Sequence, residues 1–138
     1  MDRSRRTILV TERNANIREL LRRELGRAGF SVLTAACPAE ALGKLRAEPG
    51  VGLVILDGDQ PEGETGEVEE FLGRDGPPVI LHCFSPGEVG GRETGRVVAV
   101  VQKGGDPGQL TAAVAGFFST STRSVPGARN VPGSDLGG

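Results

Sequence analysis

Five short runs of apolar residues, each followed by a stretch with helical spacing or by a turn signal, constrain the fold of this chain most. The runs are continuous rather than alternating in polarity, which is typical of parallel strands covered by helices on both faces. They extend from Ile8 to Thr11, Val32 to Ala35, Leu53 to Leu56, Val79 to Phe84 and Val97 to Val101. Strands that alternate with helices predict right-handed crossovers and an α/β, doubly wound parallel sheet.

Capping residues mark the first two helices. Asn16, with Glu19 at the third helical position, resembles a capping box, and Gly29 follows the last residue with apolar helical spacing. Pro38 suits the first turn of a second helix. A third, weaker helix is predicted around residues 68–72.

The sequence signals for the last two predicted helices differ sharply in strength. Asp106 and Pro107 supply an N-cap and a first-turn proline for a last helix that would bury apolar residues within 110–117. A fourth helix would fall within residues 85–95, but each of its glycines costs roughly 1 kcal/mol in a helix interior. We therefore expect a short helix or a loop there.

Length and composition fit one domain with a tail. The chain has 138 residues, of which 37% are hydrophobic and 25% are charged, as is ordinary for a globular protein. From Ser119 onward the sequence is rich in Ser, Gly and Pro and has no helical or strand pattern. We predict a domain over residues 1–118 and a flexible tail or linker over residues 119–138.

Charge, hydropathy and cysteine content argue against several classes of protein. The net charge of −2 gives no sign of nucleic-acid binding by this domain or of attraction to an anionic membrane. The basic start of the chain precedes only three apolar residues, which is too short for a signal peptide or a membrane span. Cys37 and Cys83 form neither a disulfide framework nor a zinc spacing. We expect a cytoplasmic protein without membrane contact.

Charged side chains directly follow three of the predicted strands. Glu12 follows the first, Asp57 the third and Lys103 the fifth. In a doubly wound sheet, ligands bind beyond the carboxyl ends of the strands, and a carboxylate there needs a partner or water. The three side chains are therefore expected to form one compact site. Its carboxylates could hold Mg²⁺, and a carboxylate can act as a nucleophile toward phosphorus.

The charged residues after the strands, and the segments around them, occur in an order that resembles the receiver domain of bacterial response regulators. The resemblance is to the chemotaxis-regulator-like type, in an atypical variant, and it covers about residues 7–118. It is carried by residues 8–21, residues 53–57 with Pro61, residues 78–81 and residues 103–107. It implies a flavodoxin-like, five-stranded parallel sheet of order 2-1-3-4-5 with helices on both faces.

The resemblance also implies roles in two-component phosphorelay signalling. Asp57 would accept a phosphoryl group from a histidine kinase or phosphotransfer protein, and Lys103 would pair with the phosphoryl oxygens. Mg²⁺ would bind Glu12, Asp57 and the backbone carbonyl of Asp59. The domain would signal through contacts with a downstream protein or a fused output domain. It would not be an enzyme, beyond self-phosphorylation from a phosphodonor and autodephosphorylation.

Three positions depart from the pattern of the family. Arg13 stands where a second acid is usual, so it could displace the metal and pair with Asp57. Cys83, a weaker hydrogen-bond donor, stands at the usual Ser or Thr position, and Val100 replaces the aromatic switch residue. His82 is expected within the fourth strand, or at its edge, and has no catalytic role.

These departures leave alternatives open. One is a phosphorylation-independent pseudo-receiver, a protein-interaction module that Arg13 would hold in one conformation. Another is a small enzyme or nucleotide-binding protein of flavodoxin type. Against the latter stand the absence of a glycine-rich phosphate loop and the lack of Trp and Tyr to stack on a flavin.

Overall fold

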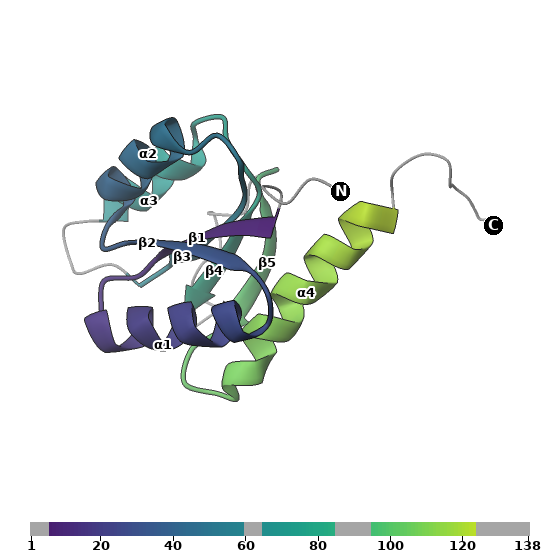
Figure 1. Cartoon of the computed structure of the whole chain (residues 1–138). Coiled ribbons are helices and arrows are strands. Elements are labelled where there is room, and N and C mark those ends of the chain that lie inside the picture. Colours follow the sequence, from purple (N-terminus) through teal and green to yellow (C-terminus); the bar gives the residue numbers. More distant parts are fainter. Residues whose placement is uncertain (1–5, 60–64, 85–94, 124–138) are drawn as a thin grey trace. The chain divides into compact units, whose positions relative to one another are not determined.

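A five-stranded parallel sheet organises the part of the chain that the computed structural model describes, residues 6–59, 65–84 and 95–123 (Figure 1). Its strand order is β2-β1-β3-β4-β5, which confirms the predicted α/β class and topology. All four strand pairs are parallel. The strands are β1 (Thr7–Thr11), β2 (Ser31–Ala35), β3 (Val51–Asp57), β4 (Val79–Cys83) and β5 (Val97–Gln102).

The burial of the three inner strands explains why their sequences are continuous apolar runs. Ile8, Leu9 and Val10 of β1 have 0% exposure, and residues 53–56 of β3 are 0–1% exposed. Because successive side chains of a strand point to opposite faces, such a strand needs apolar residues at every position when both faces are covered. Strands β2 and β5 lie at the two edges of the sheet and are only partly buried.

Helices cover both faces of the sheet within the first compact unit, which ends at Pro107. Helix α1 (Ala15–Arg27) lies on one face, and helices α2 (Pro38–Ala47) and α3 (Thr65–Leu72) lie on the other (Figure 1). On the second face, α2 and α3 contribute to an apolar core that also includes residues of β1, β3 and β4. No helix in the described ranges combines the length and apolar character needed to cross a membrane.

Helix α4 (Pro107–Arg123) belongs to a second compact unit, which begins at Gly108. It starts at the first-turn proline that the sequence predicts. The predicted boundary after residue 118 falls inside this helix, because the helix continues to Arg123. Within α4 the rings of Phe117 and Phe118 meet edge to face, with centroids 5.2 Å apart. The predicted weak helix at 85–95 lies almost wholly outside the described residues, as does the tail from residue 124.

The start of α1 corrects one prediction. The N-cap is Asn14, whose Oδ1 accepts a hydrogen bond from the backbone N–H of Ile17 at 3.0 Å. Asn16, the predicted cap, instead lies inside the first turn. Both asparagines are suitable caps, and the shorter connection from β1 is the one that forms. The other end agrees with the prediction, since Gly29 follows the helix with a φ of 102°.

Arg96 ties the end of α3 to the start of β5. Its Nη1 donates to the carbonyls of Phe71 at 2.8 Å and Arg74 at 2.9 Å, and its Nε donates to the carbonyl of Pro77 at 3.0 Å. The guanidinium also lies 5.0 Å from the centroid of the Phe71 ring. A Cβ atom at Gly76 would come within 2.7 Å of Arg96 Nη2, so a larger residue there would require the guanidinium to shift.

We predict that Arg96→Ala lowers the free energy of unfolding by about 2 kcal/mol, because three carbonyls lose a charged donor. Urea denaturation measures this change. Arg23→Ala is the matched control, because Arg23 is exposed and its Nε lies as far as 4.0 Å from Glu19 Oε2, so the ion pair is weak. The effect of this substitution should stay within about 0.5 kcal/mol. Equal losses in the two variants would contradict the assigned role of Arg96.

Candidate functional site

The register of the sheet brings Glu12, Asp57 and Lys103 to one place. Asp57 is the last residue of β3, and Glu12 and Lys103 directly follow β1 and β5. Val10 pairs with Ile55, so Glu12 and Asp57 occupy equivalent positions two residues further on the same face. On the other side, Asp57 pairs with His82 of β4, which extends the same row toward β5.

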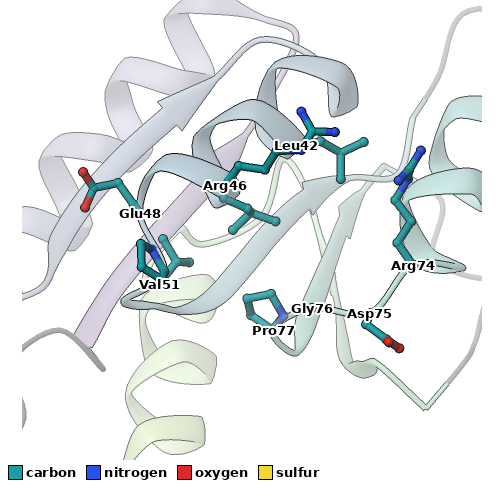
Figure 2. Close-up of a pocket in the computed structure, with 10 residues that line it drawn as sticks. Leu42, Arg46, Glu48, Val51, Arg74, Asp75, Gly76 and Pro77 are labelled. Atoms are coloured by element: carbon teal, nitrogen blue, oxygen red, sulfur yellow. The ribbon is translucent and has the colours of Figure 1, made fainter.

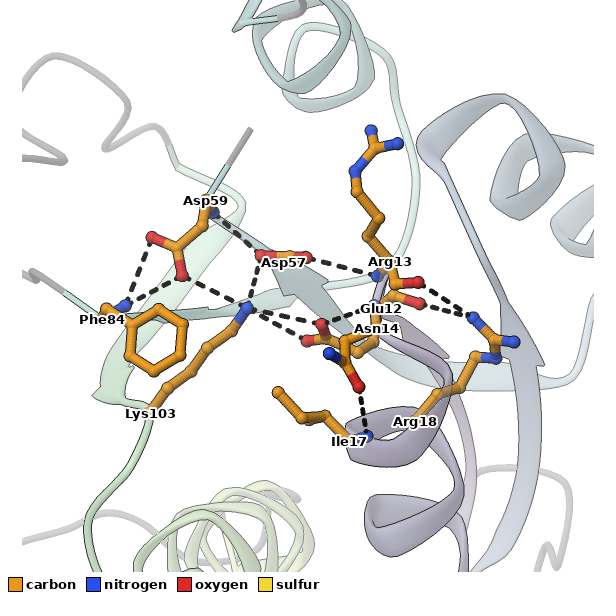
Figure 3. Close-up of polar contacts among 9 residues, drawn as sticks. All are labelled: Glu12, Arg13, Asn14, Ile17, Arg18, Asp57, Asp59, Phe84 and Lys103. Carbon is orange, nitrogen blue, oxygen red and sulfur yellow. Dashed lines mark hydrogen bonds and ion pairs between the residues drawn. The ribbon is translucent and has the colours of Figure 1, made fainter. Parts of the chain in front are cut away.

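Lys103 is the centre of this site, because its ammonium contacts three carboxylates (Figure 3). Its Nζ lies 2.7 Å from Asp57 Oδ1, 3.2 Å from Glu12 Oε1 and 3.2 Å from Asp59 Oδ2. The side chains of Lys103, Asp57 and Glu12 are 4%, 5% and 2% exposed, whereas Asp59 is 35% exposed. The ammonium therefore contacts two buried carboxylates and one partly exposed one.

Two backbone N–H groups also contact the carboxyl group of Asp57. The N–H of Asp59 donates to Oδ1 at 2.9 Å, and the N–H of Arg13 donates to Oδ2 at 3.3 Å. The next N–H, that of Gly58, is held by the carbonyl of His82 at 2.9 Å. The carboxyl group is thus oriented by chain segments that follow β1 and β3.

Glu12 retains an oxygen without a hydrogen bond. Oε2 accepts the N–H of Asn14 at 3.0 Å, whereas Oε1 is near Lys103 but has no hydrogen-bond partner. Burial, and to a smaller extent the charge of Asp57, raises the pKa of Glu12 above its usual value. For Lys103 burial acts to lower the pKa, but Asp57 and Glu12 outweigh it, so the pKa is raised and the side chain is cationic.

Arg13 contacts Asp57 through its backbone in the hydrogen bond just described. The side chain of Arg13 is exposed and extends away from the carboxyl group of Asp57 (Figure 3). The predicted pairing of its guanidinium with Asp57 is therefore not the arrangement seen. Arg18 of α1 also contacts the segment between β1 and α1, since its Nη1 donates to the carbonyl of Glu12 at 2.9 Å.

Cys83 and Val100 occupy apolar surroundings. Cys83 is 1% exposed and belongs to the core between the sheet and α2 and α3, against which Val100 also packs. The backbone of Cys83 has a separate role, because its carbonyl accepts the N–H of Lys103 at 2.8 Å. Cys83 thus helps to position the lysine through its main chain.

Two residues have roles in the site beyond those that the sequence predicts. The carboxylate of Asp59, considered only for its backbone carbonyl, accepts the N–H of Phe84 at 2.9 Å through Oδ2 and 3.2 Å through Oδ1. The centroid of the Phe84 ring lies 5.2 Å from Lys103 Nζ, and the residue is 55% exposed. The spacing of Asp59 from Asp57 was the available signal, but loop residues do not reveal where their side chains turn.

His82 lies inside the sheet, in β4, and is 6% exposed. Burial, with a contribution from Lys103, lowers the pKa of His82 to about 4, so the ring is neutral at physiological pH. Its Nδ1 has no hydrogen-bond partner. The side chain is therefore a neutral neighbour of the three carboxylates.

The donor set fits a hydrated Mg²⁺ ion. Within the described ranges, no group of three or more His, Cys, Asp or Glu side chains is arranged to hold a metal. Mg²⁺, however, commonly uses one or two carboxylates and keeps several waters. Glu12 Oε1 lacks a hydrogen bond, and the carboxylates outnumber the single ammonium, so a further cation would be compensated here.

A separate concavity of about 500 Å³ lies at the opposite end of the sheet (Figure 2). It is formed where α2 ends, where β3 begins and where the segment after α3 approaches β4. Its lining includes Leu42, Arg46, Val51, Arg74 and Pro77. None of the predicted site residues lines it, so it is distinct from the site around Asp57.

We predict that Glu12→Gln stabilises the protein at neutral pH by on the order of 1 kcal/mol. Because the pKa of Glu12 is raised by folding, the folded state loses stability as rising pH ionises this side chain. The gain should shrink at about pH 4, where Glu12 is increasingly protonated. Urea unfolding at both pH values tests this, with the exposed Glu48→Gln as control. A gain that grows toward acid pH would contradict the assignment.

No family model matches the chain, and no curated protein matches it in sequence. Solved structures do match. A CheY-like response regulator receiver domain protein from Methanospirillum hungatei JF-1 aligns with a TM-score of 0.67 and 18% identity, over 84% of this chain and 96% of that chain. The response regulator TrrA from Thermotoga maritima, solved in complex with Mg(2+)-BeF, has a TM-score of 0.66 and 28% identity over 80% and 96%.

A longer protein also matches, a probable two-component system response regulator/GGDEF domain protein. The TM-score is 0.67 with 19% identity, over 83% of this chain and 49% of that chain. Together with the strand order, these matches show that the chain has the fold of CheY-like response-regulator receiver domains and is similar to them over most of its length.

Proposed function

We propose that this chain is a receiver domain of a two-component system and that Asp57 accepts a phosphoryl group. The observation that carries the proposal is the buried contact of Lys103 Nζ with Asp57 Oδ1 at 2.7 Å, in a site that also contains Glu12. A cation held at this distance offsets negative charge that develops on the acceptor. The similarity to receiver domains, TrrA with Mg(2+)-BeF among them, supports the proposal.

The chemistry follows from the position of Asp57. A carboxylate oxygen of Asp57 attacks the phosphorus of a phosphohistidine, the phosphorus–nitrogen bond breaks, and the imidazole leaves with the bonding electron pair and takes up a proton. Lys103 pairs with a phosphoryl oxygen as the charge shifts. Mg²⁺, held by Glu12, Asp57 and the backbone carbonyl of Asp59, would screen the charges of carboxylate and phosphate. Any enzymatic activity is limited to this self-phosphorylation and to autodephosphorylation.

The partners follow from the same assignment. The phosphodonor is a histidine kinase or a phosphotransfer protein in the cytoplasm. The phosphorylated domain acts on a downstream protein or on a fused output domain, an organisation supported by the similar response regulator/GGDEF domain protein.

A phosphorylation-independent interaction module is the second candidate. Two features favour it. The side chain of Cys83 packs in the apolar core, where the family usually has a hydroxyl at the site, and the aliphatic Val100 replaces the aromatic switch residue. In that case Asp57, Glu12 and Lys103 would act as a structural ion-pair cluster. Phosphorylation distinguishes the two candidates directly.

We predict that beryllofluoride with Mg²⁺ shifts the amide NMR signals of Asp57, Asp59 and Lys103, and that acetyl phosphate adds one phosphoryl group measurable by intact mass. Asp57→Asn should abolish both effects because it removes the nucleophile. Asp75→Asn, which removes an exposed carboxylate near the start of β4, should retain them. If wild type and Asp57→Asn respond identically, the phosphoacceptor function is wrong and the interaction module stands.

We also predict that Arg13→Asp raises the affinity for Mg²⁺ by about tenfold, since it removes a cation beside the site and adds a carboxylate. Titration of Mg²⁺ against the amide shifts of residues 57 and 59 measures the change. Arg23→Asp alters the net charge equally from an exposed position on α1 and should change the affinity little. The same gain in both variants would mean that Arg13 has no specific effect.

A further inference from the structure

Two donors next to Asp57 converge on one oxygen of Asp59. Asp59 Oδ2 lies 2.9 Å from the backbone nitrogen of Phe84 and 3.2 Å from Lys103 Nζ. The same ammonium lies 2.7 Å from Asp57 Oδ1. The donor pair of Phe84 N–H and Lys103 thus already holds a carboxylate oxygen, immediately beside the acceptor.

An oxyanion attached to Asp57 would need such donors. A phosphoryl group brings several negative oxygens close to Glu12, Asp57 and Asp59, where Lys103 is the ammonium that contacts all three carboxylates. Fixed N–H groups and ammonium groups stabilise developing negative charge most when no other anion occupies them. The carboxylate of Asp59 stands in the way of this use of the donor pair.

We propose that Asp59 is an internal competitor of the phosphoryl group: its carboxylate occupies the Lys103 and Phe84 donors in the resting protein and leaves them when Asp57 is modified. This inference rests on the proposed phosphoacceptor function. The exposure of the three carboxylates supports it. Asp59 is 35% exposed and can turn into water, whereas Asp57 and Glu12 are 5% and 2% exposed.

Displacement of Asp59 also changes what holds Phe84. The backbone of Phe84 is bound by Asp59, its ring lies over Lys103, and a Cβ atom at Gly104 would touch the ring at 3.7 Å. Phe84 as a whole residue is 55% exposed. The release of Asp59 therefore frees the backbone N–H of Phe84, which donates to both carboxylate oxygens of Asp59 in the resting protein. This matters in a chain that has Val100 at the usual position of the aromatic switch.

The test is a beryllofluoride titration of the full chain by amide NMR at saturating Mg²⁺, so that metal affinity does not limit binding. Asp59→Asn keeps the shape of the side chain and removes its charge, and Asp59→Ala removes the acceptor as well. We expect both variants to reach half-saturation at an approximately fivefold to tenfold lower beryllofluoride concentration than wild type. In Asp59→Ala, the Phe84 amide signal of the resting protein should already lie away from its wild-type position.

Glu48→Gln is the matched control. It removes one exposed carboxylate three residues before β3, a strand of seven residues that ends at Asp57. The change is therefore roughly 20 Å from the site, beyond the Debye length. It should bind beryllofluoride like wild type. If wild type binds and both Asp59 variants bind equally or more weakly, the competitor role is wrong and the phosphoacceptor function stands. If neither wild type nor the variants bind, the phosphoacceptor function itself fails.

Discussion

The ammonium group of Lys103 is the interaction on which the site depends. Burial of Glu12 and Asp57 beside each other would be costly without a cation, and Lys103 lies within 3.2 Å of both. The backbone N–H of Lys103 donates in turn to the carbonyl of Cys83. Strand β4 therefore helps to position the lysine that contacts Glu12, after β1, and Asp57, at the end of β3. The excess of carboxylates over this one ammonium makes the site receptive to a further cation and sensitive to a further anion.

The sequence predicted the fold well because its signals are properties of whole elements. Continuous apolar runs correspond to buried strands, and the strand ends led directly to Glu12, Asp57 and Lys103 as neighbours. The strand order came from the resemblance to receiver domains and is confirmed by the sheet. Elements set by periodicity and topology can therefore be predicted from the sequence.

The remaining features depend on loop geometry, which periodicity does not encode. Both Asn14 and Asn16 can cap a helix, and only the path of the chain after β1 selects Asn14. The side chain of Asp59 turns toward Lys103 and Phe84, a direction that no pattern in the loop indicates. Arg96 likewise gave no signal, because its partners are backbone carbonyls at the end of α3 and beyond.

The unequal exposure of the carboxylates has a kinetic consequence. Of the three carboxylates around Lys103, Asp59 is 35% exposed, whereas Asp57 and Glu12 are 5% and 2% exposed, so Asp59 can turn into water by rotation of its own side chain. Rotation of a partly exposed side chain takes picoseconds to nanoseconds, whereas rearrangement of packed elements takes microseconds or longer. A site built in this way can exchange one anion for another at the speed of a single side chain, while the strands that define it stay in place.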